Sequence, residues 1–237
     1  MADKPWMVMI AGPNGAGKST FYKQVLQQDP FFKKVEFINL DNLAKEMAGE
    51  NEDPNKFMFP AGKIISEHLS EKIQEKKSFI YETTASGVSH HLRLLETAKK
   101  QGFKITTVFI GLASAELSYL RVQQRVNEGG HDVPAEVINR RYPKVIKNFP
   151  ELLKVSDVSA VFDNSGKTPF KLIFLMDESQ FFIFHRYPNW LNKTLKERRT
   201  SKEMIHITGK EMRALPQEKS DKIIRHIFKQ LFGNQNG

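Results

Sequence analysis

Short apolar runs alternate with amphipathic stretches along the first three quarters of the chain. The runs are almost continuously apolar, which is typical of strands covered on both faces in a parallel sheet. Helical periodicity fills the intervals, as where Ile65, Leu69 and Ile73 share one face. The alternation predicts an α/β fold: a mostly parallel, doubly wound sheet with helices on both faces. The predicted strands are residues 6–11, 35–40, 78–83, 104–111, 158–163 and 170–176.

The pattern weakens after residue 176. Residues 180–185 predict a further strand, 192–216 are polar and basic without a clear period, and 219–232 predict an amphipathic helix. We therefore expect one domain over residues 1–177 and a basic C-terminal extension over 178–237 that packs on it.

Composition narrows the class of protein. Of the 237 residues, 40% are hydrophobic and 27% charged, which is typical of a globular protein. No apolar run reaches the ~18–20 residues that cross a bilayer. The chain has no cysteine, which excludes disulfides and Cys-ligated metals, and its 7 histidines show no metal-ligand spacing. We expect a cytoplasmic protein.

The formal net charge of +9 is unevenly distributed. Residues 187–237 hold 11 Lys and Arg against 5 Asp and Glu. Two interpretations stay open: a solvated basic tail, which is the simpler one, and a patch for phosphate-rich partners.

A phosphate-binding loop follows the first predicted strand. Residues 12–19, GPNGAGKS, match the Walker A pattern G-x-x-x-x-G-K-[ST], and a predicted helix follows. The glycines let the backbone wrap a phosphate with its N–H groups inward, and the helix start adds the positive end of its dipole. Lys18 is expected to contact the β- and γ-phosphates of ATP, and Ser19 to hold Mg²⁺. The predicted nucleotide-binding residues are Gly12, Pro13, Asn14, Gly15, Ala16, Gly17, Lys18, Ser19 and Thr20.

Other motifs separate a kinase from a switch or a motor. The sequence has no Asn-Lys-x-Asp motif for reading guanine. Four apolar residues precede Asp177 and Glu178, as in a Walker B motif, but so late in the chain that we interpret them as a strand end. The balance favours a phosphotransferase.

Two acidic residues fall where predicted strands end. Asp41 follows the second strand, and Glu82 opens the run ETTASG at the end of the third. Open α/β sheets bind ligands at these ends, so Asp41 is placed to take the proton of a hydroxyl that attacks the γ-phosphate. A helix cap would explain Asp41 equally well, and a turn would explain the Glu82 segment.

Arginines surround a Gly-Gly pair at residues 129–130. Two predicted helices flanking such a hinge, each carrying arginines, are the arrangement of a lid that closes over a triphosphate. Surface arginines around a loop are the alternative. Residues 163–166, DNSG, end the fifth strand near the expected nucleotide base, although a type I turn explains them as well. The arginines concerned are Arg121, Arg125, Arg140 and Arg141.

Together these motifs resemble the zeta toxin family of P-loop kinases over residues 5–166. The GGHDVP lid resembles that of short, solitary bacterial relatives more than that of the plasmid-borne toxins. The resemblance implies transfer of the ATP γ-phosphate to a nucleotide sugar, typically to the 3′-hydroxyl of UDP-N-acetylglucosamine, and an antitoxin partner. The matching positions are 12–20, Asp41, 61–68, 82–87, 117–120, Arg125, 129–134 and 163–165.

The resemblance also implies roles for single residues. Asp41 is similar to the family's catalytic base, and Lys18 and Ser19 to its phosphate and Mg²⁺ contacts. The remaining implied contacts are Glu67, Glu82 and Thr84 on the substrate side, and Arg125 with either Arg140 or Arg141 in the lid.

Three functions are compatible with the sequence. The preferred one is a Mg²⁺-ATP-dependent kinase of a small hydroxyl compound, with neither nucleic acid nor membrane as partner. The second is a nucleic-acid or nucleotide kinase, suggested by the positive charge. The third is a non-catalytic, ATP-gated module that binds a partner through residues 170–237.

Overall fold

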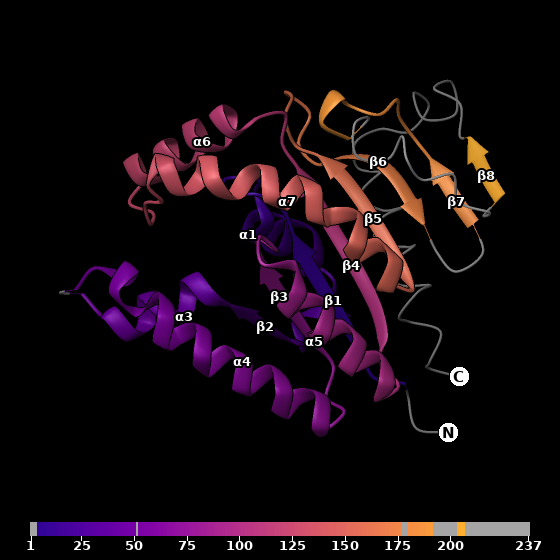
Figure 1. Ribbon diagram of the computed structural model, residues 1–237, viewed down its shortest axis with the longest axis horizontal. Coiled ribbons are helices and arrows are strands. Elements are labelled where there is room, and N and C mark those ends of the chain that lie inside the picture. The colour runs from indigo at the N-terminus through magenta and orange to yellow at the C-terminus, as the bar shows by residue number, and fades with distance from the viewer. Residues whose placement is uncertain (1–3, 51, 177–179, 192–202, 207–237) are drawn as a thin grey trace.

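The protein is described by a computed structural model that covers residues 4–50, 52–176, 180–191 and 203–206. Its eight-stranded sheet has the order β2-β3-β1-β4-β5-β6-β7-β8 (Figure 1). The strands are β1 (Trp6–Ala11), β2 (Glu36–Asn39), β3 (Phe79–Thr83), β4 (Lys104–Gly111), β5 (Val158–Asp163), β6 (Lys171–Met176), β7 (Gln180–Ile183) and β8 (Glu203–His206).

The sheet is mostly parallel, as the sequence predicts. Strands β2, β3, β1, β4 and β5 pair in parallel, and β6 then pairs antiparallel with β5. β7 is antiparallel to β6, and β8 is parallel to β7. β1, β4 and β5 have the predicted bounds, whereas β2 is shorter because Asn39 already caps the following helix.

Strand residues alternate between two cores. Met7 and Met9 of β1 belong to one buried cluster, whereas Val8 and Ile10 belong to the other. Because both faces are covered, the strands carry apolar residues at almost every position. This explains why continuous apolar runs, rather than alternating ones, marked the strands.

Helices cover both faces of the sheet. The cluster with Met7 and Met9 is closed by α4, α5 and α7, which Figure 1 shows alongside one another, and the other cluster by α1, η1 and α2. The helical segments are α1 (Lys18–Phe21), the π-helical η1 (Tyr22–Leu26), α2 (Pro30–Lys33), α3 (Leu40–Ala48), the 3-10 segment η2 (Pro54–Phe57), α4 (Met58–Gln74), α5 (Val88–Lys100), α6 (Ala115–Asn127) and α7 (Ala135–Val155).

The described part of the C-terminal extension continues the sheet through β7 and β8. β8 lies inside residues 192–216, where the sequence showed no clear period, so pairing with β7 rather than local pattern makes it a strand. The helix predicted at 219–232 lies outside the described residues, and the boundary at 177/178 stays a prediction. In the described ranges no helix is long and apolar enough to span a bilayer.

Candidate nucleotide and acceptor site

The Walker A loop joins β1 to α1, which begins at Lys18. Two of its glycines are required by their surroundings. A Cβ at Gly12 would lie 2.2 Å from the carbonyl oxygen of Ile110, and one at Gly17, whose φ is +87°, would lie 2.9 Å from Nδ2 of Asn164. Side chains there would push the loop off the neighbouring strand and loop, so only glycine keeps this geometry.

Two side chains from distant segments hold the loop by its carbonyl groups. The buried Ser118 of α6 donates its hydroxyl to the carbonyl oxygen of Asn14, at 2.5 Å. Nδ2 of Asn164 donates to the carbonyl oxygen of Ala16 at 2.9 Å, while its Oδ1 accepts from the backbone N–H of Phe170. Two carbonyl groups of the loop thus accept hydrogen bonds from side chains outside it. Asn164, expected near the nucleotide base, acts here as a support of the phosphate loop.

Lys18 and Ser19 meet the carboxylate of Glu82. The Ser19 hydroxyl donates to Oε2 of Glu82 at 2.7 Å, and Nζ of Lys18 lies 3.9 Å from Oε1. Nζ also donates to the carbonyl oxygen of Pro13 at 3.0 Å. Burial lowers the pKa of Lys18, and the charges of Glu82 and Asp41 act in the opposite direction. Glu82, expected on the substrate side, is therefore engaged by the two phosphate-side residues.

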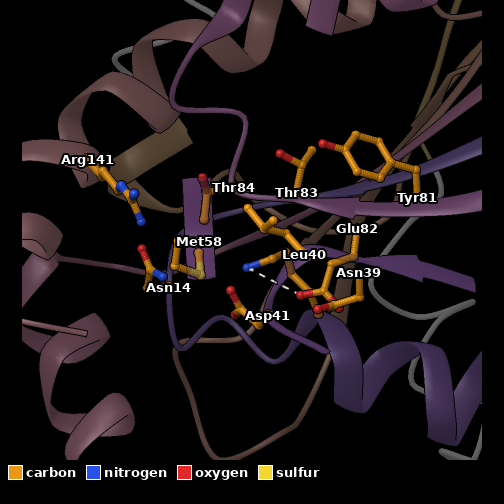
Figure 2. Close-up of a pocket in the computed structure, with 11 residues that line it drawn as sticks. Asn14, Asn39, Leu40, Asp41, Met58, Tyr81, Glu82, Thr83, Thr84 and Arg141 are labelled. Carbon is orange, nitrogen blue, oxygen red and sulfur yellow. Dashed lines mark ion pairs between the residues drawn. The ribbon is translucent and has the colours of Figure 1, made fainter. Parts of the chain in front are cut away.

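Two adjoining hollows open around these residues. The larger, of about 530 Å³, lies over the Walker A loop and is bounded by α6 and residues 164–170. The smaller, of about 90 Å³, is bounded by the ends of β2 and β3, the start of α3 and helix α7 (Figure 2). Four residues line both hollows and so mark the junction between them: Asn14, Lys18, Asp41 and Glu82.

Asp41 lies in the first turn of α3, but it is not the helix cap. The side chain of Asn39 fills that position, because its Oδ1 accepts the backbone N–H of Asn42 at 2.9 Å. The cap interpretation of Asp41 is therefore wrong, and its carboxylate borders both hollows instead. Figure 2 shows Asp41 facing the same space as Thr84 and Arg141.

The structure separates the predicted arginines. Arg121 and Arg125 line the larger hollow, and Arg141 lines the smaller one. Arg140 is exposed and lines neither, so of these two arginines only Arg141 lies with the other candidate residues. Burial lowers the pKa of Arg141 and the neighbouring Asp41 carboxylate raises it, although a guanidinium keeps its charge throughout.

The Gly-Gly segment packs against Arg125. Nη2 of Arg125 donates to the carbonyl oxygen of His131 at 2.5 Å. A Cβ at Gly130 would lie 2.5 Å from Cγ of Arg125, so the absence of a side chain there lets the arginine lie under the loop. Gly130 is thus required by packing.

Other predicted residues fall as follows. Thr84 lines the smaller hollow and Thr20 the larger. Glu67 is exposed on α4 and lines neither, so the structure does not bring it to the other candidate residues. Met58 and Tyr81 also line the smaller hollow, although the sequence analysis did not predict them as site residues. The position of Tyr81 directly before Glu82 could have indicated it, whereas nothing in the local sequence indicated Met58.

These features define an α/β P-loop kinase fold, with a Walker A loop after β1, the middle one of the five parallel strands, and with α6 and α7 beside it. The sequence pattern of the AAA domain family AAA_33 matches residues 7–142. The chain belongs to this family.

One known sequence and two solved structures are similar to this chain. An uncharacterized protein of Haemophilus influenzae is 29% identical over 136 residues, which cover 57% of this chain and 91% of that protein. The AvrRxo1-ORF1:-ORF2 complex is similar at a TM-score of 0.65 and 14% identity, over 82% of this chain and 66% of that one. The PezAT toxin–antitoxin system of Streptococcus pneumoniae is similar at a TM-score of 0.53 and 18% identity, over 68% of each chain. At these identities the two solved structures support the fold alone.

Proposed function

We propose that the protein is a Mg²⁺-ATP-dependent kinase that phosphorylates a hydroxyl group of a small molecule, with a nucleotide sugar such as UDP-N-acetylglucosamine as the acceptor. The observation that carries the proposal is the position of Asp41, whose carboxylate borders both the larger hollow above the Walker A loop and the smaller hollow beside it. One group thereby reaches the nucleotide side and the acceptor side.

The larger hollow suits ATP. Backbone N–H groups of the Walker A loop and the start of α1 favour a triphosphate, and Lys18 adds a positive charge. In this proposal the base lies against the segment after β5 that lines the same hollow, which consists of Asn164, Gly166, Lys167, Pro169 and Phe170. AvrRxo1-ORF1:-ORF2, a protein of similar fold, has been crystallised with ATP.

Ser19 and Glu82 suit Mg²⁺. Mg²⁺ prefers oxygen ligands and is usually bound by one or two carboxylates together with substrate phosphates. The Ser19 hydroxyl and the Glu82 carboxylate already lie in contact, at 2.7 Å. When bound, the metal would neutralise charge on the phosphates. The chain's own residues supply the remaining steps.

In the proposed reaction, the acceptor hydroxyl enters the smaller hollow and its oxygen attacks the γ-phosphorus. The bond between that phosphorus and the β–γ bridging oxygen breaks, ADP leaves, and the hydroxyl proton passes to the Asp41 carboxylate. Arg121 and Arg125, which line the larger hollow, and Arg141, which lines the smaller one, stabilise the charge that moves onto the phosphate oxygens.

A partner protein belongs to the same proposal. PezAT is a toxin–antitoxin system, and AvrRxo1-ORF1 is found in a complex with ORF2. We extend this to an antitoxin-like partner that controls access to the larger hollow. The support is the similarity of fold together with the lid around residues 129–134.

The test is a transfer assay with ATP, Mg²⁺ and UDP-N-acetylglucosamine, in which mass spectrometry detects an acceptor heavier by one phosphoryl group. We expect Asp41→Asn to lower kcat by about 10²- to 10⁴-fold, the usual contribution of a general base, with ATP affinity retained. Glu46→Gln, an exposed position on the same helix, is the matched control and leaves the rate unchanged. No transfer to this or any other sugar nucleotide by protein that binds ATP would refute the proposal, as would an active Asp41→Asn variant.

A further inference from the structure

The turn that follows β3 forms one wall of the smaller hollow. Thr83 and Thr84 line it, and Ala85 adopts a φ of +55° while being 1% exposed. A left-handed conformation is unfavourable for alanine, so contacts around the turn must hold it. We call residues 83–86 the acceptor turn.

One set of contacts comes from within the turn and from α5. The Thr83 hydroxyl accepts the backbone N–H of Ala85 at 3.0 Å and lies 3.1 Å from Nε2 of the buried His91. Because burial lowers the pKa of His91 to about 4, the ring is neutral near pH 7 and Nε2 can accept the Thr83 hydroxyl proton. These contacts fix the start of the turn.

The other set comes from α7. Nδ2 of Asn148 donates to the carbonyl oxygens of Ala85, at 3.3 Å, and Ser86, at 3.1 Å. An amide nitrogen carries two hydrogens, so one side chain can serve both carbonyls. Asn148 therefore fixes the end of the turn from a helix that is 62 residues distant from Ser86 along the chain.

α7 also carries the arginine of the same hollow. Arg141 precedes Asn148 by seven residues, which places both on one face of the helix about two turns, or about 10 Å, apart. Between them on the same helix, Tyr142 donates its hydroxyl to the carbonyl oxygen of Leu112, just past the end of β4. One helix thus carries Arg141, the Tyr142 contact to the sheet edge and the Asn148 contact to the acceptor turn.

We infer that Asn148 is a positioning residue for the acceptor: it holds the acceptor turn at a set distance from Arg141, so that acceptor binding depends on α7 while ATP binding does not. The inference rests on the proposed function, because the smaller hollow is an acceptor site only if the protein is a kinase. The nucleotide side has its own supports, Ser118 and Asn164, which do not involve Asn148.

Loss of the Asn148 amide would leave two carbonyls at a strained turn without their donor. Asn148→Ala removes the donor, and Asn148→Asp replaces it with a carboxylate that faces the same carbonyls and has no hydrogen to give. A lost hydrogen bond of about 1 kcal/mol corresponds to about a fivefold to tenfold change in an equilibrium constant. Asn139→Ala, an exposed asparagine on the same helix, is the matched control.

The experiment uses the full chain and two measurements. Hydrogen exchange without ligand follows backbone amides 84–87, and we expect them to exchange at least fivefold faster in both Asn148 variants and at the wild-type rate in Asn139→Ala. Steady-state transfer with ATP and UDP-N-acetylglucosamine then gives both KM values, and we expect the acceptor KM to rise about fivefold to tenfold while the ATP KM stays within twofold.

The outcomes separate the inference from the proposed function. Unchanged exchange in both Asn148 variants would overturn the inference, and so would faster exchange with the two KM values rising together or neither changing. Wild-type protein that transfers no phosphate would contradict the proposed function, whereas the exchange result would still decide whether Asn148 holds the turn.

Discussion

Two carboxylates in the site have similar chemistry but different surroundings. Glu82 is 7% exposed, accepts the Ser19 hydroxyl and faces Lys18. Asp41 is half-buried at the junction of the two hollows, in the first turn of α3. A carboxylate already held by a hydroxyl and an ammonium group suits a fixed electrostatic task, whereas one that borders open space suits proton transfer. In the proposed reaction, the surroundings of the two carboxylates, rather than their residue types, distinguish their roles.

His91 makes stability depend on pH. Burial, and to a lesser degree the neighbouring His90, lowers its pKa to about 4 from 6.5. Between these values the unfolded chain binds a proton that the folded chain does not, so the free energy of unfolding falls as the pH falls through this window. Above pH 6.5 the ring is neutral in both the folded and the unfolded chain, and His91 does not reduce the free energy of unfolding. Near pH 4 the free energy of unfolding is lower by about 3 kcal/mol.

We predict that His91→Gln reduces this acid sensitivity. Urea unfolding at pH 7.5 and pH 4.5 gives the loss of free energy between the two conditions, and the loss should be about 2–3 kcal/mol smaller in the variant than in the wild type. His90→Gln, which changes the exposed neighbour, should keep a loss close to that of the wild type. Equal losses in the wild type and His91→Gln would show that His91 is not the group responsible.

At the scale of elements, the Gly-Gly segment between α6 and α7 packs closely against Arg125. A Cβ at position 130 would approach Arg125 to 2.5 Å at Cγ and 2.8 Å at its carbonyl oxygen. Gly130→Ala should therefore displace Arg125 from the carbonyl of His131. Because small misplacements of groups that contact phosphate are costly, we predict that kcat/KM falls by up to about 100-fold.

Gly62→Ala is the contrasting change, since the nearest atom to its Cβ would be 4.0 Å away on Leu40. Gly62 lies inside α4, where alanine is favoured by about 1 kcal/mol, so this variant should gain stability at unchanged activity. Thermal unfolding and the transfer assay on both variants check the pair. A fully active Gly130→Ala variant would show that Arg125 does not need its position under the loop.

The sequence predicted elements better than contacts between them. The buried strands could be found because their apolar runs reflect burial on both faces, and the Walker A loop because its glycines and Lys18 are spaced by the geometry of one turn. Asn164, Ser118 and Asn148 act through carbonyl groups 62 to 148 residues away along the chain, and local pattern carries no sign of such pairings. β8 was missed for the same reason, since its partner β7 defines it.

For the whole molecule, the order of the strands divides the site into two sides. β1 lies between β3 and β4, in the middle of the five parallel strands, and the Walker A loop leaves the sheet there. The smaller hollow is built on one side, from the ends of β2 and β3, and the larger hollow on the other, from α6 and the loop after β5. This is the crevice at the carboxyl ends of strands where open α/β sheets bind ligands. Asp41, in the helix that follows β2, lines both hollows.

The charge of the whole molecule supplies the last prediction. The net charge is +9, and residues 187–237 contribute 11 Lys and Arg against 5 Asp and Glu, whereas the Walker A loop and Asp41 lie in the less basic part of the chain. Charges separated by more than the Debye length of about 8 Å at physiological salt are screened, so a basic segment attracts nucleic acid only through local phosphate contacts.

We predict that fluorescence anisotropy detects weak binding of a single-stranded oligonucleotide at 50 mM salt. This binding should be lost at 200 mM salt and should not depend on ATP. At 200 mM salt the oligonucleotide should neither accept phosphate nor slow transfer to a sugar nucleotide. Phosphorylation of the oligonucleotide, or ATP-dependent binding that survives 200 mM salt, would instead make nucleic acid the acceptor, because only an occupant of the smaller hollow would couple to the nucleotide in that way.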